Sequence, residues 1–230
     1  MKRAITKDRC LILFVKYPER GKVKSRLAHH WTDDLAAGLY KNFIFDIIAI
    51  LEKGQFSFRI YFDPPEKEKE IKALLGEKYK YALQSGTDLG ERMKNAFLQE
   101  FATGFKMVVL IGSDFPDLPL DIIEESFNVL ENKSSTVIGP SADGGYYLIA
   151  FRQDAFCPDI FAGPRWGTAL AFEKTMSILR SREHPPTVLP KWRDIDTRED
   201  LDDLIKRSVD TPFADSNTMK FLRDNNFIKQ

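Results

Sequence analysis

A segment near the start of the chain concentrates basic side chains that could bind phosphate. The sequence KYPERGKVKSR, Lys16–Arg26, holds five basic residues and one acid, Glu19. Main-chain N–H groups and Lys or Arg side chains together bind phosphate oxygens well. The segment therefore predicts a cradle for a diphosphate, although a solvated charged loop is an equally ordinary outcome for this composition. The residues assigned to the cradle are Lys16, Arg20, Gly21, Lys22, Lys24, Ser25 and Arg26.

This basic segment matches neither of the two common phosphate-binding signatures. The P-loop pattern GxxxxGK[ST] and the dinucleotide pattern GxGxxG are both absent from it. Its position after an apolar run is what favours a binding role over a solvated loop.

A second candidate group follows the apolar run Met107–Ile111. The sequence GSDFPDLP, Gly112–Pro119, places Asp114 just after this run. A carboxylate at the end of a buried strand is a ligand for a hard cation such as Mg²⁺ or Mn²⁺, which would bridge a diphosphate and stabilise charge on a leaving group. The structural alternative is that Asp114 and Asp117 cap the helix that follows, a role that suits Asp117 better.

The segment GPSADGGYYL, Gly139–Leu148, separates two predicted strands with an acid and two glycines. An Asp-Gly pair is most often a hairpin turn, and paired glycines also let the main chain approach a ligand closely. Asp143 is the candidate general base of the site. Gly144 and Gly145 are assigned to a sugar or acceptor pocket.

The last acidic segment is DIDTREDL, Asp194–Leu201. Thr197 and Asp200 are typical of a helix start, which explains only part of the motif. Asp194 and Asp196 have no such role, and one of them is a candidate second metal ligand opposite Asp114.

Trp166 lies in the Gly- and Pro-containing segment FAGPRWGT, Phe161–Thr168. We assign it to the acceptor or sugar pocket, although a place in the core is the commoner role for such a Trp. The three His residues show no zinc spacing with Cys, and the pattern GxSxG is absent. These absences argue against a zinc site and a serine hydrolase.

The overall charge is balanced, with 34 Lys plus Arg against 34 Asp plus Glu in 230 residues. Binding of nucleic acid or of an anionic membrane by bulk charge is therefore not expected. No apolar run approaches the roughly 20 residues of a membrane span. Cys10 and Cys157 make no disulfide framework, so a reduced, cytoplasmic location is expected. The sequence carries no signal of an oligomeric state.

Short apolar runs alternate with amphipathic segments along the chain. The predicted strands are Cys10–Lys16, Phe56–Phe62, Tyr79–Leu83, Met107–Ile111, Thr136–Ile138, Tyr146–Phe151 and Val188–Leu189. The predicted helices are Leu35–Leu51, Glu66–Leu75, a segment starting at Asp88, Pro119–Leu130, Thr168–Leu179 and a last one capped by Thr197. This alternation is typical of an α/β fold with a mixed, mostly parallel sheet and helices on both faces.

We expect a single domain over residues 1–230, with residues 208–230 as a tail on the surface. Sheets of this kind bind ligands at the carboxyl ends of their strands. The loops that follow the strands are therefore the places where chemistry is expected.

Taken together, the segments resemble one family. KYPERGKVKSRL, TDLGERM, GSDFPDLP, GPSADGGYYL and DIDTREDL occur in the order seen in a bacterial glycosyltransferase-like family often found beside radical-SAM selenodomain proteins. The resemblance spans roughly Leu11–Leu204. Motifs in a shared order are far more specific than any one of them alone.

The resemblance implies the GT-A fold of nucleotide-diphospho-sugar transferases, which sugar-nucleotide and cofactor nucleotidyltransferases share. It implies that the Lys16–Arg26 segment meets the nucleotide diphosphate. It also implies that Asp114 stands where the metal-binding aspartate of the fold stands, with Asp196 as second ligand and Mg²⁺ or Mn²⁺ as cofactor. The chain departs from the family in Ser25 for the usual Thr and Gly167 for the usual Ser, and it keeps only one carboxylate of the D-x-D found in many GT-A enzymes.

The first functional hypothesis is transfer of a sugar from a nucleotide-diphospho-sugar donor to an acceptor that the sequence does not identify. The alternative reaction is nucleotidyl transfer with release of pyrophosphate, although the GxGxR loop typical of those enzymes is missing. A third hypothesis is a nucleotide-sugar-binding module without turnover.

Overall fold

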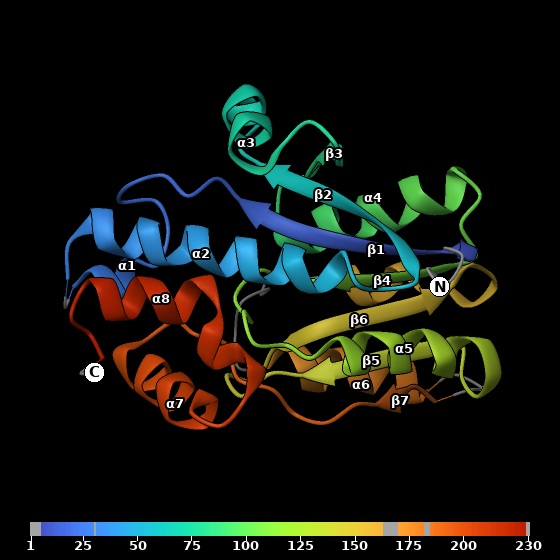
Figure 1. The fold of residues 1–230 in the computed structure, drawn as a ribbon. Helices are drawn as coiled ribbons and strands as arrows, with labels where there is room; N and C mark the ends of the chain where they lie inside the picture. The colour runs from blue at the N-terminus through green and yellow to red at the C-terminus, as the bar shows by residue number, and fades with distance from the viewer. Residues whose placement is uncertain (1–5, 30, 163–169, 182–184, 229–230) are drawn as a thin grey trace.

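A seven-stranded sheet lies at the centre of the protein (Figure 1). The computed structural model describes residues 6–29, 31–162, 170–181 and 185–228. The strands are β1 (Thr6–Lys16), β2 (Phe56–Asp63), β3 (Lys80–Leu83), β4 (Met107–Ile111), β5 (Thr136–Pro140), β6 (Tyr146–Arg152) and β7 (Thr187–Val188). Their order across the sheet is β3-β2-β1-β4-β6-β5-β7. Within this sheet, β6 pairs antiparallel with both of its neighbours, and the remaining pairs are parallel.

Helices cover both faces of the sheet (Figure 1). The α-helices are α1 (Ser25–Ala28), α2 (Asp33–Leu51), α3 (Glu68–Leu75), α4 (Leu89–Ala102), α5 (Leu120–Asn132), α6 (Ala171–Arg180), α7 (Arg198–Ser208) and α8 (Asn217–Asp224). Four short 3₁₀ turns complete the described elements: η1 (Pro65–Lys67), η2 (Gln153–Ala155), η3 (Pro158–Phe161) and η4 (Pro212–Asp215).

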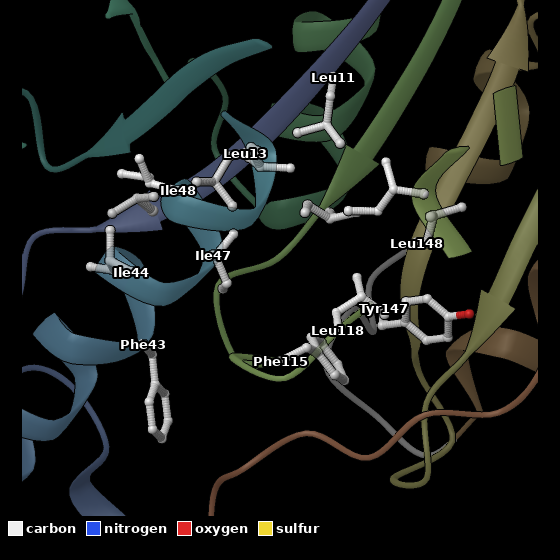
Figure 2. Close-up of a cluster of buried hydrophobic side chains, with 14 of the residues drawn as sticks. Leu11, Leu13, Phe43, Ile44, Ile47, Ile48, Phe115, Leu118, Tyr147 and Leu148 are labelled. Atoms are coloured by element: carbon white, nitrogen blue, oxygen red, sulfur yellow. The ribbon is translucent and has the colours of Figure 1, made fainter. Parts of the chain in front are cut away.

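Strand β1 supplies both faces of the sheet with apolar side chains. Successive side chains of a strand point to opposite faces. Leu11 and Leu13 accordingly pack in the core shared with α2, α5, α7 and α8, and Figure 2 shows Leu13 beside Ile47 and Ile48 of α2. Ile12 packs in a second core with α4 and α6. A run that is apolar at every position is therefore what a strand covered on both sides requires.

The predicted fold class is confirmed, and the predicted strands lie within a few residues of the observed ones. Strand β4 occupies the predicted run Met107–Ile111, and β1 begins earlier than predicted, at Thr6. The predicted helix Glu66–Leu75 begins as the turn η1 and continues as α3. The apolar runs locate strands well because burial on both faces leaves few polar positions in them.

The segment expected to be a surface tail contains η4 and α8, and α8 packs against α2 (Figure 1). Asp46 of α2, only 5% exposed, holds the start of α8. Its carboxylate accepts hydrogen bonds of 2.8 Å from the main-chain N–H groups of Asn217 and Thr218 and from the Asn217 side chain. A buried carboxylate at a helix N-terminus satisfies amides that the helix itself leaves unpaired.

Replacing Asp46 with alanine should detach this end of the chain. The variant Asp46→Ala loses three hydrogen bonds to a buried charge, so we expect the free energy of unfolding to fall by about 2–4 kcal/mol. Urea denaturation followed by circular dichroism measures the change. The exposed Asp210→Ala serves as control and should stay within about 0.5 kcal/mol of the unmodified protein. Equal stability of both variants would show that α8 does not depend on Asp46.

Candidate active site

A lysine and two aspartates from distant parts of the chain meet at the carboxyl edge of the sheet. The ammonium of Lys24 lies 2.5 Å from Oδ1 of Asp114 and 2.6 Å from Oδ1 of Asp196. Lys24 follows β1, Asp114 follows β4, and Asp196 precedes α7. The structure thus brings together both predicted metal ligands and one residue of the predicted diphosphate cradle.

Local structure fixes each of the three positions. Lys24 adopts a left-handed backbone conformation, with φ of 48°, just before α1. Such a conformation is uncommon outside glycine and is often found at functional sites. Asp196 directly precedes a capping box in which Thr197 and Asp200 bond reciprocally, and its own N–H donates to Asp200. The N–H of Ile195 donates to the carbonyl of Asp114 at 3.0 Å, which ties the two loops together.

The side chain of Lys24 is 3% exposed, although it carries a charge. Its ammonium also lies 5.8 Å from the ring centroid of Tyr40 and 5.7 Å from that of Phe43. Burial alone would lower the pKa of Lys24, but Asp114 and Asp196 outweigh it and hold that pKa above its ordinary value. Lys24 is therefore a permanent cation at the centre of the site.

Tyr40 of α2 supports the loop that carries Asp114. Its hydroxyl lies 2.6 Å from the hydroxyl of Ser113 and accepts a hydrogen bond from the N–H of Lys16 at 3.1 Å. Burial and the nearby charge of Asp114 raise the pKa of Tyr40 to about 12. The phenol therefore stays protonated at neutral pH.

Beside Lys24 a pocket of about 480 Å³ opens along the carboxyl edge of the sheet. One part of its lining is polar and acidic. The other part is largely apolar and comes from β1, from α4, from β4 and the loop after it, and from the start of β6. The polar lining includes Lys16, Asp63, Gln84, Arg92, Ser113, Asp114, Ser141, Asp143, Asp194 and Asp196; the apolar lining includes Phe14, Leu89, Met93, Leu110, Phe115 and Tyr146.

The loop that carries Asp114 is anchored by the apolar residues that follow it. Phe115 and Leu118 are buried, and Figure 2 shows both near Tyr147 of β6. The ring centroids of Phe115 and Tyr147 are 5.7 Å apart. The buried Phe115 and Leu118 fix the main chain of this loop in the core, while the carboxylate of Asp114 lies at the pocket.

Two further acids of the pocket, Asp143 and Asp194, come from the β5–β6 turn and from the loop before α7. Asp143 is exposed, and its Oδ1 accepts a hydrogen bond of 2.9 Å from the N–H of Gly145. Gly144 adopts a positive φ of 89°, which glycine tolerates without strain. Asp143 therefore both stabilises the turn and lines the pocket, as Gly145 also does.

Asp194 accepts a hydrogen bond of 3.0 Å from the hydroxyl of Ser141. Burial raises the pKa of Asp194, the negative charge of Asp143 and that of Asp196 raise it further, and the Ser141 hydrogen bond opposes them. Several carboxylates therefore share this part of the pocket. Their mutual repulsion and the burial of Asp194 make its ionised form unfavourable.

The other residues of the predicted diphosphate cradle take different positions. Lys16 lines the pocket, and its ammonium donates to the carbonyl of Lys22 at 2.9 Å. The side chain of Lys22 is exposed, and Arg20 pairs with Asp34 at the surface at 3.3 Å.

Three further cradle residues lie close to the start of α1. Ser25 and Arg26, both exposed, form its first residues. Gly21 has φ of +70°, the left-handed region that favours glycine. Among the described residues of the cradle, Lys16 is thus the one whose side chain lies at the pocket in this structure.

One further expectation, that Asp117 caps a helix, is not met. Asp117 does not cap α5, whose N-cap residue is Pro119 with no side-chain hydrogen bond. Its carboxylate instead pairs with Arg207 at 2.8 Å and accepts from the indole of Trp192 at 3.2 Å. Trp166 lies outside the described residues.

Several pocket residues carry no motif that the sequence analysis could use. Tyr40 sits within an amphipathic helix, where an aromatic residue is ordinary. Asp63 and Gln84 each end or follow a strand, and this position at a strand end is the one signal that could have found them. Asp194 was considered only as a metal ligand, whereas the structure adds its bond to Ser141.

The fold and site define a single α/β domain with the architecture of a nucleotide-diphospho-sugar transferase. The chain belongs to the family described as "Uncharacterized protein conserved in bacteria (DUF2064)", whose model matches residues 47–168. It is similar to a protein of Desulfovibrio desulfuricans G20 described as a "putative nucleotide-diphospho-sugar transferase". The two are 41% identical over 96% of each chain, with a TM-score of 0.92.

More distant structures share the fold alone. One is a 4-diphosphocytidyl-2C-methyl-D-erythritol synthase from Anaerococcus prevotii DSM 20548, 11% identical over 86% of this chain and 96% of that one, with a TM-score of 0.56. Another is Rv0371c of Mycobacterium tuberculosis H37Rv in complex with manganese, 13% identical over 86% and 97% of the two chains, with a TM-score of 0.50. No curated protein matched the chain. Within its described residues, no helix is both long and apolar enough to cross a membrane.

The raised pKa of Asp194 leads to a prediction about stability and pH. Because folding raises this pKa above its ordinary value of 3.8, the ionised carboxylate destabilises the folded state at neutral pH. That cost decreases as the pH falls through the folded-state pKa and is gone below the ordinary value. Asp194→Asn can still accept the hydrogen bond from Ser141. We therefore expect this variant to be more stable than the unmodified protein near neutral pH, with the difference shrinking toward about pH 4.

Thermal or urea denaturation across this pH range tests the expectation, with Asp210→Asn at an exposed position as control. A destabilised Asp194→Asn, or a difference that does not change with pH, would contradict it.

Proposed function

We propose that the protein transfers a sugar from a nucleotide-diphospho-sugar to an acceptor. The observation that carries the proposal is one pocket of about 480 Å³ at the carboxyl edge of the sheet. It is lined by Asp114 and Asp196, which both pair with the buried Lys24, and by several apolar side chains. The similarity to the D. desulfuricans protein, at 41% identity over nearly the whole chain, supports the same class of reaction.

In this proposal the donor lies along the pocket with its diphosphate near Lys16 and Asp114. Lys16 is the cradle cation that lines the pocket, and the exposed Arg20, Lys22 and Arg26 are available to the diphosphate from the same segment. Lys24 contributes through its ion pairs with the two aspartates, which hold their side chains in place. Fixed positive charge near a leaving diphosphate is usually a large part of the catalytic effect.

The carboxylates at Lys24 also fit a divalent cation. Asp114 and Asp196 each place one oxygen on the Lys24 ammonium, and their side chains are 45% and 41% exposed. The described residues contain no cluster of three or more His, Cys, Asp or Glu that could hold a metal. Mg²⁺ is commonly held by one or two carboxylates, with substrate phosphates and water completing its shell, and Asp114 and Asp196 meet that need. When bound there, Mg²⁺ or Mn²⁺ would neutralise charge on the diphosphate.

The acceptor side of the pocket is assigned to the β5–β6 turn. The acceptor nucleophile attacks the anomeric carbon, the bond from that carbon to the diphosphate oxygen breaks, and a nucleoside diphosphate leaves. Asp143, at the pocket, would take the proton from the nucleophile. Gly144, Gly145 and Trp166 remain proposed contacts of the sugar or the acceptor.

The products distinguish sugar transfer from nucleotidyl transfer. Incubation of the protein with nucleotide sugars, Mn²⁺ and a mixture of candidate acceptors should release a nucleoside diphosphate, detected by chromatography. Release of pyrophosphate from a nucleoside triphosphate and a sugar phosphate, with no nucleoside diphosphate formed, would contradict the proposal.

Asp114 is the residue whose loss tests the site directly. In Asp114→Ala, Lys24 keeps only Asp196 as a partner, and the site loses one of the two carboxylates proposed to hold the cation at the diphosphate. We therefore expect turnover to fall about 10²- to 10³-fold. The extra thermal stabilisation by Mn²⁺ in the presence of nucleoside diphosphate should also disappear.

The matched control for this variant is Asp121→Ala, an exposed aspartate in the first turn of α5. It should keep both the turnover and the Mn²⁺-dependent stabilisation. Unchanged values in Asp114→Ala would remove this site from the proposal.

A further inference from the structure

Lys24 lies on the protein side of the proposed cation site rather than in the pocket itself. Asp114 and Asp196 both line the pocket, and their side chains are 45% and 41% exposed. The side chain of Lys24 is 3% exposed and is not part of the pocket lining. A cation that arrives from the pocket therefore meets two carboxylates that already hold a positive charge on their buried side.

The two ion pairs of Lys24 use one oxygen of each carboxylate. Its ammonium lies 2.5 Å from Oδ1 of Asp114 and 2.6 Å from Oδ1 of Asp196. An ionised carboxylate has two oxygens and several acceptor positions, so Oδ2 of each aspartate is not used by these pairs. A divalent cation can therefore approach the two aspartates from the pocket while Lys24 stays where it is.

The side chain of Lys24 is held in position by its surroundings. Its backbone is left-handed, with φ of 48°, and its carbonyl accepts a hydrogen bond of 3.0 Å from the N–H of Ala28. The ammonium also lies within 6 Å of two ring centroids, at 5.8 Å from Tyr40 and 5.7 Å from Phe43. The positive charge is thus a fixed part of the site, and it still acts on the carboxylates when a cation binds.

Lys24 reduces the attraction of the site for a divalent cation. Two carboxylates and one ammonium leave a single net negative charge where the aspartates meet. The ammonium also repels any cation held by the same carboxylates, because like charges a few Å apart interact strongly where little water separates them. A bound diphosphate changes this balance, since it adds negative charge and the further oxygen ligands that Mg²⁺ requires.

The two aspartates are positioned by the main chain as well as by Lys24. The N–H of Ile195 donates to the carbonyl of Asp114 at 3.0 Å, and the N–H of Asp196 donates to the carboxylate of Asp200 at 3.2 Å. These bonds hold the two loops together without the ammonium. Removal of the Lys24 charge should therefore change the electrostatics of the site more than its geometry.

We propose that Lys24 makes binding of the divalent cation conditional on the nucleotide. The ammonium leaves Asp114 and Asp196 with too little negative charge to hold Mg²⁺ or Mn²⁺ alone, so the cation binds only together with a diphosphate. This inference rests on the proposed function, because it concerns the cation and the diphosphate of that site. Lys24 acts here through charge and is not itself a ligand of the cation.

Mn²⁺ alone is the probe that tests this role. Free Mn²⁺ gives an electron paramagnetic resonance signal that decreases when the ion binds, so weak binding to the full chain is measurable without nucleotide. Lys24→Met keeps the length of the side chain and its apolar contact with Tyr40 and Phe43, and it removes the charge. We expect this variant to bind Mn²⁺ at least about tenfold more tightly than the unmodified protein.

Two further variants locate the effect. Lys53→Met changes the net charge equally at an exposed position just beyond α2, outside the pocket lining, and should bind Mn²⁺ as the unmodified protein does. Addition of Asp114→Ala to Lys24→Met should abolish the gain. Asp143 and Asp194 also line the pocket but are present in all these variants, so they do not explain a difference between them. Circular dichroism melts establish which variants are folded.

The unmodified protein supplies a test that needs no substitution. Saturation by an equimolar amount of Mn²⁺ in the absence of nucleotide would overturn the inference, even where Lys24→Met does not fold. Calorimetric titration with GDP, UDP, CDP and ADP, each with and without Mn²⁺, measures the coupling. We expect at least one of these diphosphates to bind about tenfold or more tightly when Mn²⁺ is present.

The outcomes separate this inference from the proposed function. Folded Lys24→Met that binds Mn²⁺ no more tightly than the unmodified protein, or a gain that survives the loss of Asp114, would overturn the role of Lys24 while leaving the nucleotide site in place. Failure of all four nucleoside diphosphates to bind, with Mn²⁺ or without it, would overturn the proposed function, and the coupling to the nucleotide with it.

Discussion

The arrangement of the whole site depends on the burial of one ammonium group. A charge that is 3% exposed is tolerated only when opposite charges replace the water it has lost, and Lys24 obtains these from Asp114 and Asp196. The loop after β1, the loop after β4 and the segment before α7 must therefore meet at one point. Two local features accompany this contact: the left-handed backbone at Lys24, and the hydrogen bond from the N–H of Ile195 to the carbonyl of Asp114.

Packing in the hydrophobic core fixes the position of the loops that carry Lys24, Asp114 and Asp196. Helix α2 packs on β1 and also carries Tyr40, whose hydroxyl contacts the loop of Asp114 through Ser113. The same helix holds the start of α8 through Asp46. Helix α2 therefore connects packing far from the pocket to the loops that carry the site.

The fold was predictable because strands buried on both faces produce continuous apolar runs, as at Met107–Ile111. The positions of Asp114 and Asp143 at the pocket followed from the rule that loops after strands of such sheets bind ligands. The bridge by Lys24 was not predictable, since 172 residues separate it from Asp196 and charge patterns do not encode which partners meet. The place of Gln84 at the pocket was not predictable for a related reason: the carbonyls that hold its amide belong to other strands.

The reversed direction of β6 has a consequence for how such proteins diversify. It divides the sheet into a parallel part, β3-β2-β1-β4, and a part made of β6, β5 and β7. Under the proposed function, the donor's diphosphate lies at loops of the first part and the acceptor at the turn that enters β6. Because these loops come from separate stretches of the chain, mutations that alter one substrate leave the other's contacts untouched. Relatives can in this way keep a common donor while their acceptors drift apart.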